Sequence, residues 1–308
     1  MPLWEVGMVV AGLLLLYAGA EGLVKGAASL ALRLGITPLI VGLTVVAFGT
    51  SAPELLVGVV GTDDIAVGNI LGSNVANFAL ILGAAALVRP IQIRAHAIRR
   101  DMPVMVVATL FFVVLLLDGQ LTRLNGVMLL VAMAMYLGYT YYEAQRDMDR
   151  VGRPDVSGER HWALSVLYVV LGIAALALGA YWMVEGAVGI AEYSGVSQLV
   201  IAITVVALGT SLPELATSLV AAWRDEMDLS VGNVIGSNVF NLLLVLGVVS
   251  VLGDVFVDQS ALRVDVWVML AVSVAMWPLL ATGRKLSRWE GALLLAGYVV
   301  YVITLFLR

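Results

Sequence analysis

Long apolar runs recur along the whole of this sequence, and they restrict the chain to a fold that spans a membrane. A run of about 20 apolar residues crosses a bilayer as a helix, because a helix satisfies its own backbone hydrogen bonds in lipid. In agreement, 61% of the 308 residues are hydrophobic and only 13% are charged, whereas about a quarter are charged in a soluble domain. We therefore predict an all-α integral membrane protein. Its ten predicted transmembrane helices span 4–31, 37–60, 65–88, 102–117, 122–142, 162–191, 197–222, 229–252, 264–281 and 289–307.

The lysines and arginines predict how these helices enter the membrane. With the N-terminus outside, only Arg123, Arg263 and Arg308 of the 17 lysines and arginines fall on the outer side, and the other 14 fall inside. Such a bias is the positive-inside pattern of membrane proteins. We therefore predict a multi-pass protein of the cell (plasma) membrane, with both the N- and the C-terminus outside.

The sequence also repeats itself. Residues 42–60, GLTVVAFGTSAPELLVGVV, align with 202–220, AITVVALGTSLPELATSLV, and residues 68–83 align with 232–247. Because each half holds five predicted helices, the second half must enter the membrane upside down relative to the first. Inverted repeats are typical of secondary transporters, whose substrates bind near the midplane between the halves. The predicted domains are a first five-helix repeat, a cytoplasmic linker and a second, inverted five-helix repeat, at 1–145, 146–161 and 162–308.

In each copy the motif Gly-Thr-Ser-x-Pro-Glu interrupts an apolar span, at 49–54 and at 209–214. The proline removes one backbone donor and clashes with the carbonyl of the residue four positions earlier, which here is the glycine. We predict that both helices open at this point and free the carbonyls around Ala47 and Ala207. Free carbonyls at membrane depth are tolerated where they line a cavity or bind something, and oxygen ligands suit hard cations such as calcium.

Two glutamates follow these prolines directly. Glu54 and Glu214 lie in the first turn of the resumed helix, where the helix dipole favours a negative charge. An ionisable residue near mid-membrane costs about a few kcal/mol or more and is a functional candidate by default. Protonated glutamates that only pack between helices are the alternative, but the same costly residue occupies the same place in both copies.

The helix after each interrupted span carries a polar face. Three polar residues spaced i, i+4 and i+8 line one side of it in each copy. They are Asn69, Ser73 and Asn77 in the first copy and Asn233, Ser237 and Asn241 in the second. Taken alone, such residues are more often hydrogen-bonding partners between helices, but here they lie opposite a duplicated Glu-Thr-Ser segment. Asn74 and Asn238 point elsewhere on the helix, and we interpret them as structural.

These motifs resemble those of a known family. The duplicated GTS-x-PE and GSN-x-x-N segments are similar to the two alpha repeats of the cation/calcium exchanger superfamily, and the sodium/calcium exchanger branch in its prokaryotic form fits best. The resemblance covers essentially the whole chain. It implies ten helices, with the second, third, seventh and eighth around a central site. It also implies that three sodium ions exchange for one calcium ion by alternating access, while the long first and sixth helices slide across the rest.

The same resemblance implies a role for each residue of the motifs. The ligands implied for calcium are the carboxylates of Glu54 and Glu214, the hydroxyls of Thr50 and Thr210, and the carbonyls of Ala47 and Ala207. The residues implied for the flanking sodium sites are Ser51, Ser73, Ser211 and Ser237, with Asn77 and Asn241 facing the centre. No cofactor is implied beyond the transported ions, Ca²⁺ and Na⁺.

Two details sort this sequence among the relatives that it resembles. Proton-coupled members carry a GN-x-x-E type motif where this chain has Gly-Thr-Ser, and potassium-dependent members typically carry aspartate where Asn241 stands. Two glutamates balance one calcium ion, whereas three sodium ions leave one positive charge. We therefore predict electrogenic exchange without potassium, unless another acid such as Glu21 or Glu185 joins the site. The alternative is a calcium/proton antiporter, or one for another divalent cation, with the same fold.

Other classes of function fit the sequence poorly. An intramembrane enzyme needs a nucleophile with a base, or a metal motif such as H-E-x-x-H, and the sequence has neither. We therefore predict that the protein is not an enzyme. A passive channel would share the cation-binding oxygens but needs a continuous pore. No basic stripe interleaved with aromatic residues indicates nucleic-acid binding, and no obligatory protein partner is evident beside the lipid bilayer.

A few charged or titratable side chains lie outside the motifs. Glu21 and Lys25 are spaced i, i+4 and are predicted to form a local ion pair. The chain has no cysteine, and its two histidines, His96 and His161, lie in charged segments between helices. We interpret both histidines as solvated rather than as metal ligands.

Overall fold

The structure is a computed structural model that describes residues 3–151, 162–194, 207–258 and 261–306. These ranges are almost entirely helical, as the sequence predicts. Eight helices within them are long and apolar enough to cross a membrane, which makes the chain a multi-pass membrane protein. The eight spans are Leu3–Leu34, Pro38–Val60, Asp63–Val88, Arg123–Arg146, Trp162–Tyr193, Met227–Leu252, Ala261–Ala281 and Arg288–Leu305.

Several of these spans are divided by short π-helical turns, which are labelled η. The elements of the first half are α1 (Leu3–Leu34), α2 (Pro38–Val41), η1 (Gly42–Val46), α3 (Ala47–Thr50), α4 (Ala52–Val60), α5 (Asp63–Ala76), η2 (Asn77–Leu82), α6 (Gly83–Val88), β1 (Ile91–Gln92), η3 (Ala97–Asp101), α7 (Met102–Leu115), β2 (Gln120–Leu121) and α8 (Arg123–Val151). Those of the second half are α9 (Trp162–Tyr193), α11 (Ala207–Gly209), α12 (Leu212–Trp223), α13 (Met227–Val239), η5 (Phe240–Val245), α14 (Leu246–Leu252), β3 (Val255–Phe256), η6 (Ala261–Asp265), α15 (Val266–Ala281), β4 (Lys285–Leu286) and α16 (Arg288–Phe306).

Two of the ten predicted helices are not among the eight spans. The helix predicted at 102–117 is present as α7, but it has only 14 residues and follows the charged π-helical turn η3. The helix predicted at 197–222 is described only from Ala207 onward, as α11 and α12, because 195–206 lie outside the described residues. The other eight predicted helices are confirmed.

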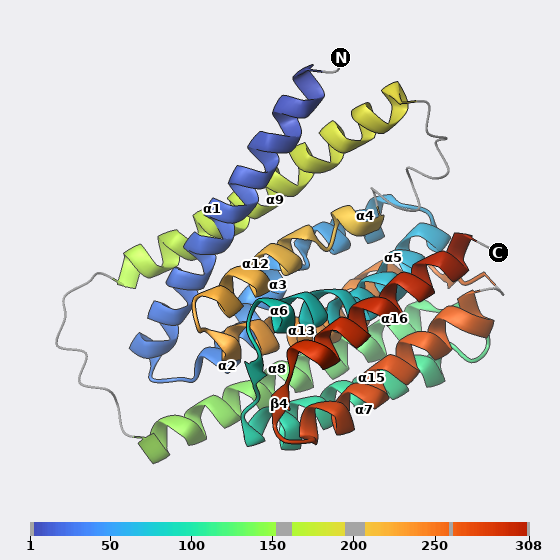
Figure 1. Ribbon diagram of the computed structural model, residues 1–308. Helices are drawn as coiled ribbons and strands as arrows, with labels where there is room; N and C mark the ends of the chain where they lie inside the picture. Colours follow the sequence, from blue (N-terminus) through green and yellow to red (C-terminus); the bar gives the residue numbers. More distant parts are fainter. Residues whose placement is uncertain (1–2, 152–161, 195–206, 259–260, 307–308) are drawn as a thin grey trace.

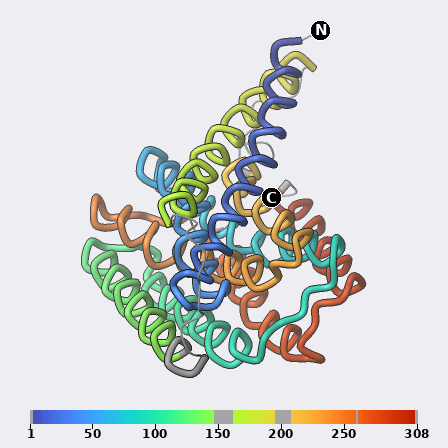
Figure 2. The backbone as a smooth tube through the Cα atoms, turned by 90° about the vertical axis from the view of Figure 1, so that its left-hand side faces the viewer, coloured from blue at the N-terminus to red at the C-terminus, as the bar shows by residue number. Residues whose placement is uncertain are grey.

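Two long helices stand apart from the rest of the molecule. α1 and α9 have 32 residues each, and Figure 1 and Figure 2 show this pair projecting from the bundle of the other helices. Glycines bring the two backbones together. A Cβ atom on Gly19 would lie 2.9 Å from the carbonyl oxygen of Gly172, and one on Gly12 would lie 2.7 Å from that of Gly179. Small residues of this kind let membrane helices approach closely and pack through dispersion contacts.

The other helices pack around two central segments. Asp63–Val88 and Met227–Leu252 are the most buried of the eight spans. One hydrophobic cluster joins them to α7, α8 and α15, and its fully buried side chains include Phe78, Met105 and Phe112. Because other helices surround these two segments, the polar residues near their centres are buried, among them Asn74, Asn77, Asn238 and Asn241.

Two short strand pairs connect the halves. β1 pairs antiparallel with β4, with Ile91 opposite Leu286, and β2 pairs antiparallel with β3, with Leu121 opposite Val255. In each pair one strand comes from the first half and one from the second. Each loop therefore pairs with a loop of the other half: the strand after α6 pairs with the strand before α16, and the strand after α14 pairs with the strand before α8.

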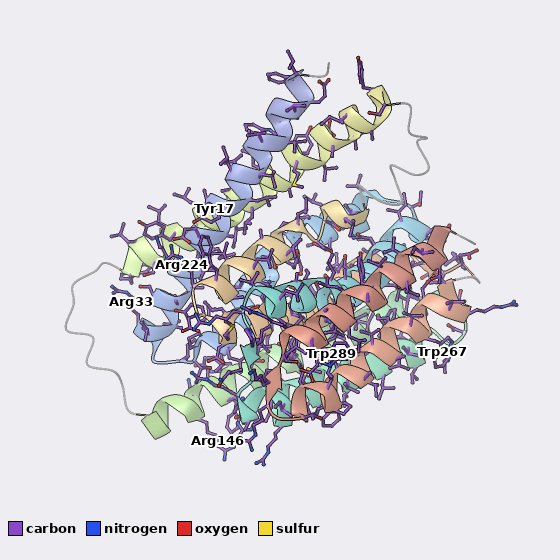
Figure 3. The ribbon with its side chains drawn as sticks, in the orientation of Figure 1. Tyr17, Arg33, Arg146, Arg224, Trp267 and Trp289 are labelled. Atoms are coloured by element: carbon purple, nitrogen blue, oxygen red, sulfur yellow. The ribbon has the colours of Figure 1, made fainter. Side chains whose placement is uncertain are left out.

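Basic side chains gather toward one end of the helices. Arg33, Arg146 and Arg224 lie toward the same end in Figure 3, and Trp267 lies toward the other end. All three arginines belong to the side that the sequence predicts to be cytoplasmic. Their gathering is what the positive-inside pattern expects of a folded membrane protein, while the side of the membrane itself stays a prediction.

Near this end, α1 meets the end of α12 through charged and aromatic side chains. The predicted ion pair between Lys25 and Glu21 is confirmed at 2.7 Å. Glu21 also pairs with Arg224, and the ring centroids of Tyr17 and Trp223 lie 6.3 Å apart. These contacts are where the side chains of α1 meet those at the end of α12.

The interpretation of His96 as a solvated residue was wrong. Its side chain is only 25% exposed, with Nδ1 3.6 Å from Asp101 and Nε2 3.5 Å from Glu143. Glu143, near the end of α8, also pairs with Arg100 of η3. The histidine is enclosed because two segments far apart in the sequence bring their charged side chains to it. His161 lies outside the described residues.

The close backbone contact between α1 and α9 predicts that Gly19→Val destabilises the protein. The added atoms would meet the Gly172 carbonyl and the Leu176 nitrogen at 2.9 and 2.8 Å, and overpacking of this kind costs about 1–3 kcal/mol. Gly7→Val is the matched control, since a Cβ atom on Gly7 meets no described atom within 4 Å. The measurement is the thermal unfolding midpoint of the purified protein in detergent. Equal midpoints for the two variants would contradict this packing.

Candidate cation site

Two buried glutamates occupy equivalent turns of the two halves. Glu54 lies in the first turn of α4 and Glu214 in the first turn of α12, and neither residue has any exposed surface. The two carboxylates are close enough to repel each other, and Thr210 and Ser73 lie beside Glu54. The structure thus brings four of the predicted site residues together, two from each half.

Each glutamate follows an interruption of its helix. Ser51 alone separates α3 from α4, and its φ of −84° and ψ of 7° depart from helical values. Thr210 and Ser211 separate α11 from α12. A proline occupies the first turn of each resumed helix, where its missing N–H leaves no intrahelical bond unmade. Both helices are therefore interrupted at the predicted motif.

The expectation of a free carbonyl was wrong for Ala47. Its oxygen accepts a hydrogen bond from the Ser51 amide at 3.0 Å, and Thr50 Oγ1 lies 3.4 Å from it. The proline at position 53 withholds its bond from the carbonyl of Gly49, two residues further along, so the turn that contains Ala47 stays closed. In the second copy the Ser211 amide donates to the Leu208 carbonyl at 3.2 Å. Ala207 begins α11, directly after the residues that are not described.

The serine at each interruption does not cap the helix that follows it. A serine at this position commonly accepts a hydrogen bond from an N–H group of the first turn, but neither serine does so. Instead, Ser51 Oγ donates to Glu214 Oε1 at 3.1 Å, and Ser211 Oγ donates to Ser73 Oγ, also at 3.1 Å. Both hydroxyl groups therefore reach across to the opposite half.

The threonines of the two motifs also bond to the opposite half. Thr50 Oγ1 donates to Asn233 Oδ1 at 3.0 Å, and Thr210 Oγ1 donates to Asn69 Oδ1 at 2.9 Å. Thr50 Oγ1 lies 3.4 Å from Ser237 Oγ as well. Because the two asparagines occupy equivalent positions in the repeat, the same contact is made twice, once in each direction. Each of the six hydroxyl residues of the predicted site thus contacts a residue of the opposite half.

Four buried asparagines form two more links between the halves. Asn77 Nδ2 donates to Asn238 Oδ1 at 2.9 Å, and Asn241 Nδ2 donates to Asn74 Oδ1 at 3.1 Å. The interpretation that Asn74 and Asn238 point elsewhere was wrong, because residues three apart share a helix face just as residues four apart do. The sequence did contain evidence for this inward orientation, since Asn74 lies three residues before Asn77 and Asn238 three residues before Asn241.

Several buried oxygen atoms at this site receive no hydrogen bond from any residue that the structure describes. They are both carboxylate oxygens of Glu54, Oε2 of Glu214, Oδ1 of Asn77 and Oδ1 of Asn241. A buried acceptor without a partner costs about 1–3 kcal/mol, and more when it is charged. Carboxylate, amide and hydroxyl oxygens are also the ligands that hard cations such as calcium prefer. The arrangement therefore fits a cation that takes the place of the missing donors.

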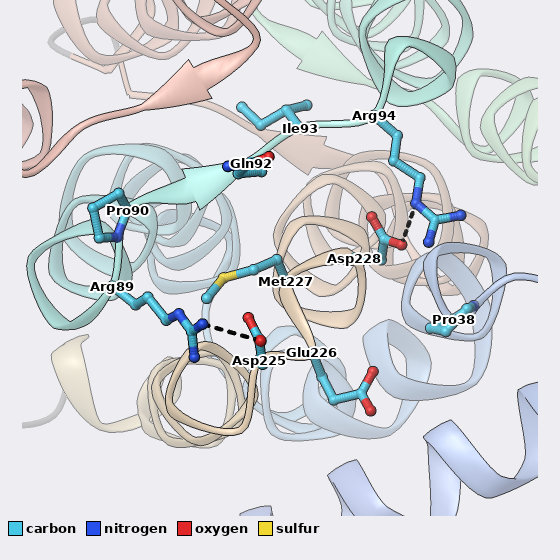
Figure 4. Close-up of a pocket in the computed structure, with 10 residues that line it drawn as sticks. All are labelled: Pro38, Arg89, Pro90, Gln92, Ile93, Arg94, Asp225, Glu226, Met227 and Asp228. Carbon is cyan, nitrogen blue, oxygen red and sulfur yellow. Dashed lines mark hydrogen bonds and ion pairs between the residues drawn. The ribbon is translucent and has the colours of Figure 1, made fainter.

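A separate pocket of about 590 Å³ lies beyond the far end of α12. Figure 4 shows two ion pairs in it: Arg89 lies 3.0 Å from Asp225, and Arg94 lies 2.6 Å from Asp228. Burial raises the pKa of Glu226, and repulsion from Asp228 and Asp225 adds to the rise. Since arginines already neutralise two of its acids, this pocket does not present the unpartnered oxygens that the carboxylate pair presents.

Comparison with known proteins gives a match along both halves of the chain. The family described as "Sodium/calcium exchanger protein" matches residues 4–142 and 164–307. The inner membrane protein YrbG of Escherichia coli is 37% identical, over 99% of this chain and 97% of its own length. The sodium/calcium exchanger MaX1 of Methanosarcina acetivorans is 31% identical, over 97% of each chain.

A solved structure resembles this one over nearly its full length. The sodium/calcium exchanger from Methanococcus jannaschii superposes with a TM-score of 0.86 at 31% sequence identity. The superposition covers 98% of this chain and 99% of that one. The likeness in structure therefore extends over both halves, as the likeness in sequence does.

Proposed function

The chain belongs to the sodium/calcium exchanger protein family, and we propose that it exchanges sodium ions for calcium across the membrane by alternating access. That it is a cation/calcium antiporter follows from the family. The ions and their binding site are our proposal. The observation that carries it is the set of buried oxygens without donors among the described residues around Glu54 and Glu214, because one cation can be bound by several acceptors of this kind at once.

In this proposal one cluster binds both ions. The calcium ligands are Glu54, Glu214, Thr50, Thr210 and the carbonyls of Ala47 and Ala207, the residues of the sodium sites are Ser51, Ser73, Ser211 and Ser237, and Asn77 and Asn241 face the centre. The hydrogen bonds that the hydroxyl residues make to the opposite half support this set. The Ala47 carbonyl joins it by exchanging its long 3.4 Å contact with Thr50 for the ion.

We propose ten transmembrane helices in two inverted five-helix repeats with broken central helices, at 1–145 and 162–308. The cytoplasmic linker is 146–161, and both termini lie on the outer side of the cell membrane. The reciprocal bonds from Thr50 to Asn233 and from Thr210 to Asn69 support the equivalence of the halves. The α1–α9 pair slides across the bundle to expose the site to either side, and its tight internal packing supports movement as one unit.

The charge of the cluster, with the exchange of three sodium ions for one calcium ion that the family resemblance implies, makes the proposed transport electrogenic. Among the described residues, no group of three or more Asp, Glu, His or Cys side chains is placed to hold a metal, so the two glutamates stand without a third acid. Together they balance one calcium ion, whereas three sodium ions leave one positive charge in excess. Exchange of three sodium ions for one calcium ion therefore moves charge across the membrane, and no carboxylate remains for potassium.

The test of the function is calcium uptake by the purified protein in proteoliposomes. Vesicles loaded with sodium and diluted into sodium-free buffer should take up radioactive calcium, because outward sodium flow drives calcium inward. Vesicles with equal sodium on both sides are the control and should not accumulate it. Uptake driven equally well by a pH gradient would establish the calcium/proton alternative. Calcium flux without any counter-ion gradient would indicate a passive channel instead.

We further predict that this exchange responds to voltage and does not need potassium. One net charge moves in each cycle, and each elementary charge carries about 2.3 kcal/mol per 100 mV. The measurement is sodium-driven calcium uptake in vesicles whose membrane potential is set with an ionophore. Rates that do not change with voltage, or that vanish when potassium is removed, would show that the cluster holds a different number of charges.

Glu54→Gln and Glu214→Gln should each abolish calcium uptake and leave the protein folded. Removing one carboxylate leaves a divalent ion with half of its compensating charge at a fully buried site. Glu185→Gln is the matched control, because this exposed glutamate of α9 undergoes the same chemical change outside the cluster. Uptake near the wild-type rate in either cluster variant would refute the site, and loss of uptake in Glu185→Gln would indicate a third acid.

A further inference from the structure

We propose that Asn74 is a positioning residue, which holds the side-chain amide of Asn241 with its oxygen, rather than its nitrogen, toward the cation. The inference rests on the proposed function, since it assumes that the buried cluster binds calcium and sodium. It concerns a residue that lies beside the cluster and acts through Asn241.

An asparagine side chain can adopt two orientations that place either its oxygen or its nitrogen toward a ligand. One end of the amide is an oxygen that accepts and the other is an NH₂ group that donates, and the two have nearly the same size. A half-turn of the terminal torsion exchanges them, and that torsion is soft. Only the oxygen can bind a cation. A neutral asparagine at the centre of the site therefore needs something that fixes which end faces the ion.

The structure provides a fixed reference for Asn74. Its Nδ2 atom donates to the backbone carbonyl of Asn238 at 3.4 Å and lies 3.8 Å from the sulfur of Met269. Both partners are acceptors, and a backbone carbonyl cannot exchange its role as an amide can. The nitrogen of Asn74 is therefore held toward α13 and α15, and its oxygen is turned toward Asn241.

Asn241 then receives its orientation from Asn74. Its Nδ2 atom donates to Asn74 Oδ1 at 3.1 Å, and its own Oδ1 atom is buried without a donor. The η5 turn that carries Asn241 packs against α4, which carries Glu54. The backbone carbonyl of Asn238 accepts from Asn74, and Asn74 in turn accepts from Asn241. These two hydrogen bonds leave the side-chain oxygen of Asn241 for the ion.

The equivalent pair in the other half lacks this reference. Asn77 Nδ2 donates to Asn238 Oδ1 at 2.9 Å, but Nδ2 of Asn238 has no partner among the described residues. Both amides of that pair can turn over together without losing a bond to a fixed group. The inference is therefore made for Asn74 and Asn241 and not for their counterparts.

The first arm of the experiment is Asn74→Leu, which keeps the branching and the number of heavy atoms of the side chain but cannot accept a hydrogen bond. The freed Asn241 amide should turn its NH₂ group toward the carboxylates, where it competes with the cation. Binding of radioactive calcium to the purified protein, and the KM for calcium in sodium-driven uptake, should both weaken by about 10- to 100-fold, as for other partners that orient a metal ligand. Asn74→Ala serves the same purpose if the leucine variant does not fold.

The second arm separates orientation from general damage. Asn241→Asp places an oxygen at both ends of the group, so no wrong orientation exists. Adding Asn74→Leu to Asn241→Asp should leave calcium affinity as it is in Asn241→Asp alone, although the same change is costly beside Asn241. This rescue is a result that a merely structural role of Asn74 would not produce.

The remaining outcomes overturn the inference in distinguishable ways. If Asn74→Leu weakens calcium binding equally in both backgrounds, Asn74 only supports the fold. If it weakens binding in neither, the orientation of Asn241 does not depend on Asn74. If the wild-type protein itself shows no calcium binding and no sodium-driven uptake, the proposed function fails and this inference fails with it.

Discussion

A carboxylate buried among membrane-spanning helices must be compensated, because the interior offers no water to solvate it. Glu54 and Glu214 place this requirement at the centre of the molecule, where neither has any exposed surface. The interrupted helices give each of them a helix N-terminus, whose dipole favours a negative charge. The hydroxyl groups around them are turned inward across the repeat rather than used as caps. Among the described residues, the fold leaves a set of buried oxygens without donors, and these are the oxygens that we propose as cation ligands.

The polar network is shared between the halves rather than divided between them. Thr50 is bonded to an asparagine of the second half, and Thr210 to the equivalent asparagine of the first. The two strand pairs repeat this exchange at the loops. A displacement of one half relative to the other would therefore disturb several bonds together, which ties the geometry of the ion site to the packing of the whole bundle.

The sequence predicts much of this arrangement because two of its constraints are absolute. Bilayer thickness fixes the length of an apolar helix, so eight of the predicted spans recur in the structure. The doubled Pro-Glu motif fixes where the helices break. Two features that the sequence did not predict depend on contacts between segments: Asn74 turns inward to meet a helix of the other half, and His96 lies against the charged end of α8. The third is local, since Ala47 keeps its hydrogen bond because the proline affects a different carbonyl.

The reciprocal bonds between the halves also bear on how the chain is made. The first half enters the membrane before the second has been synthesised, yet the acceptors for Thr50 and the amide partner for Asn77 lie on α13. Glu54, Asn74 and their neighbours therefore lack the partners that bury them until most of the chain has been synthesised. The duplicated site therefore cannot be completed until the second half of the chain has been inserted beside the first.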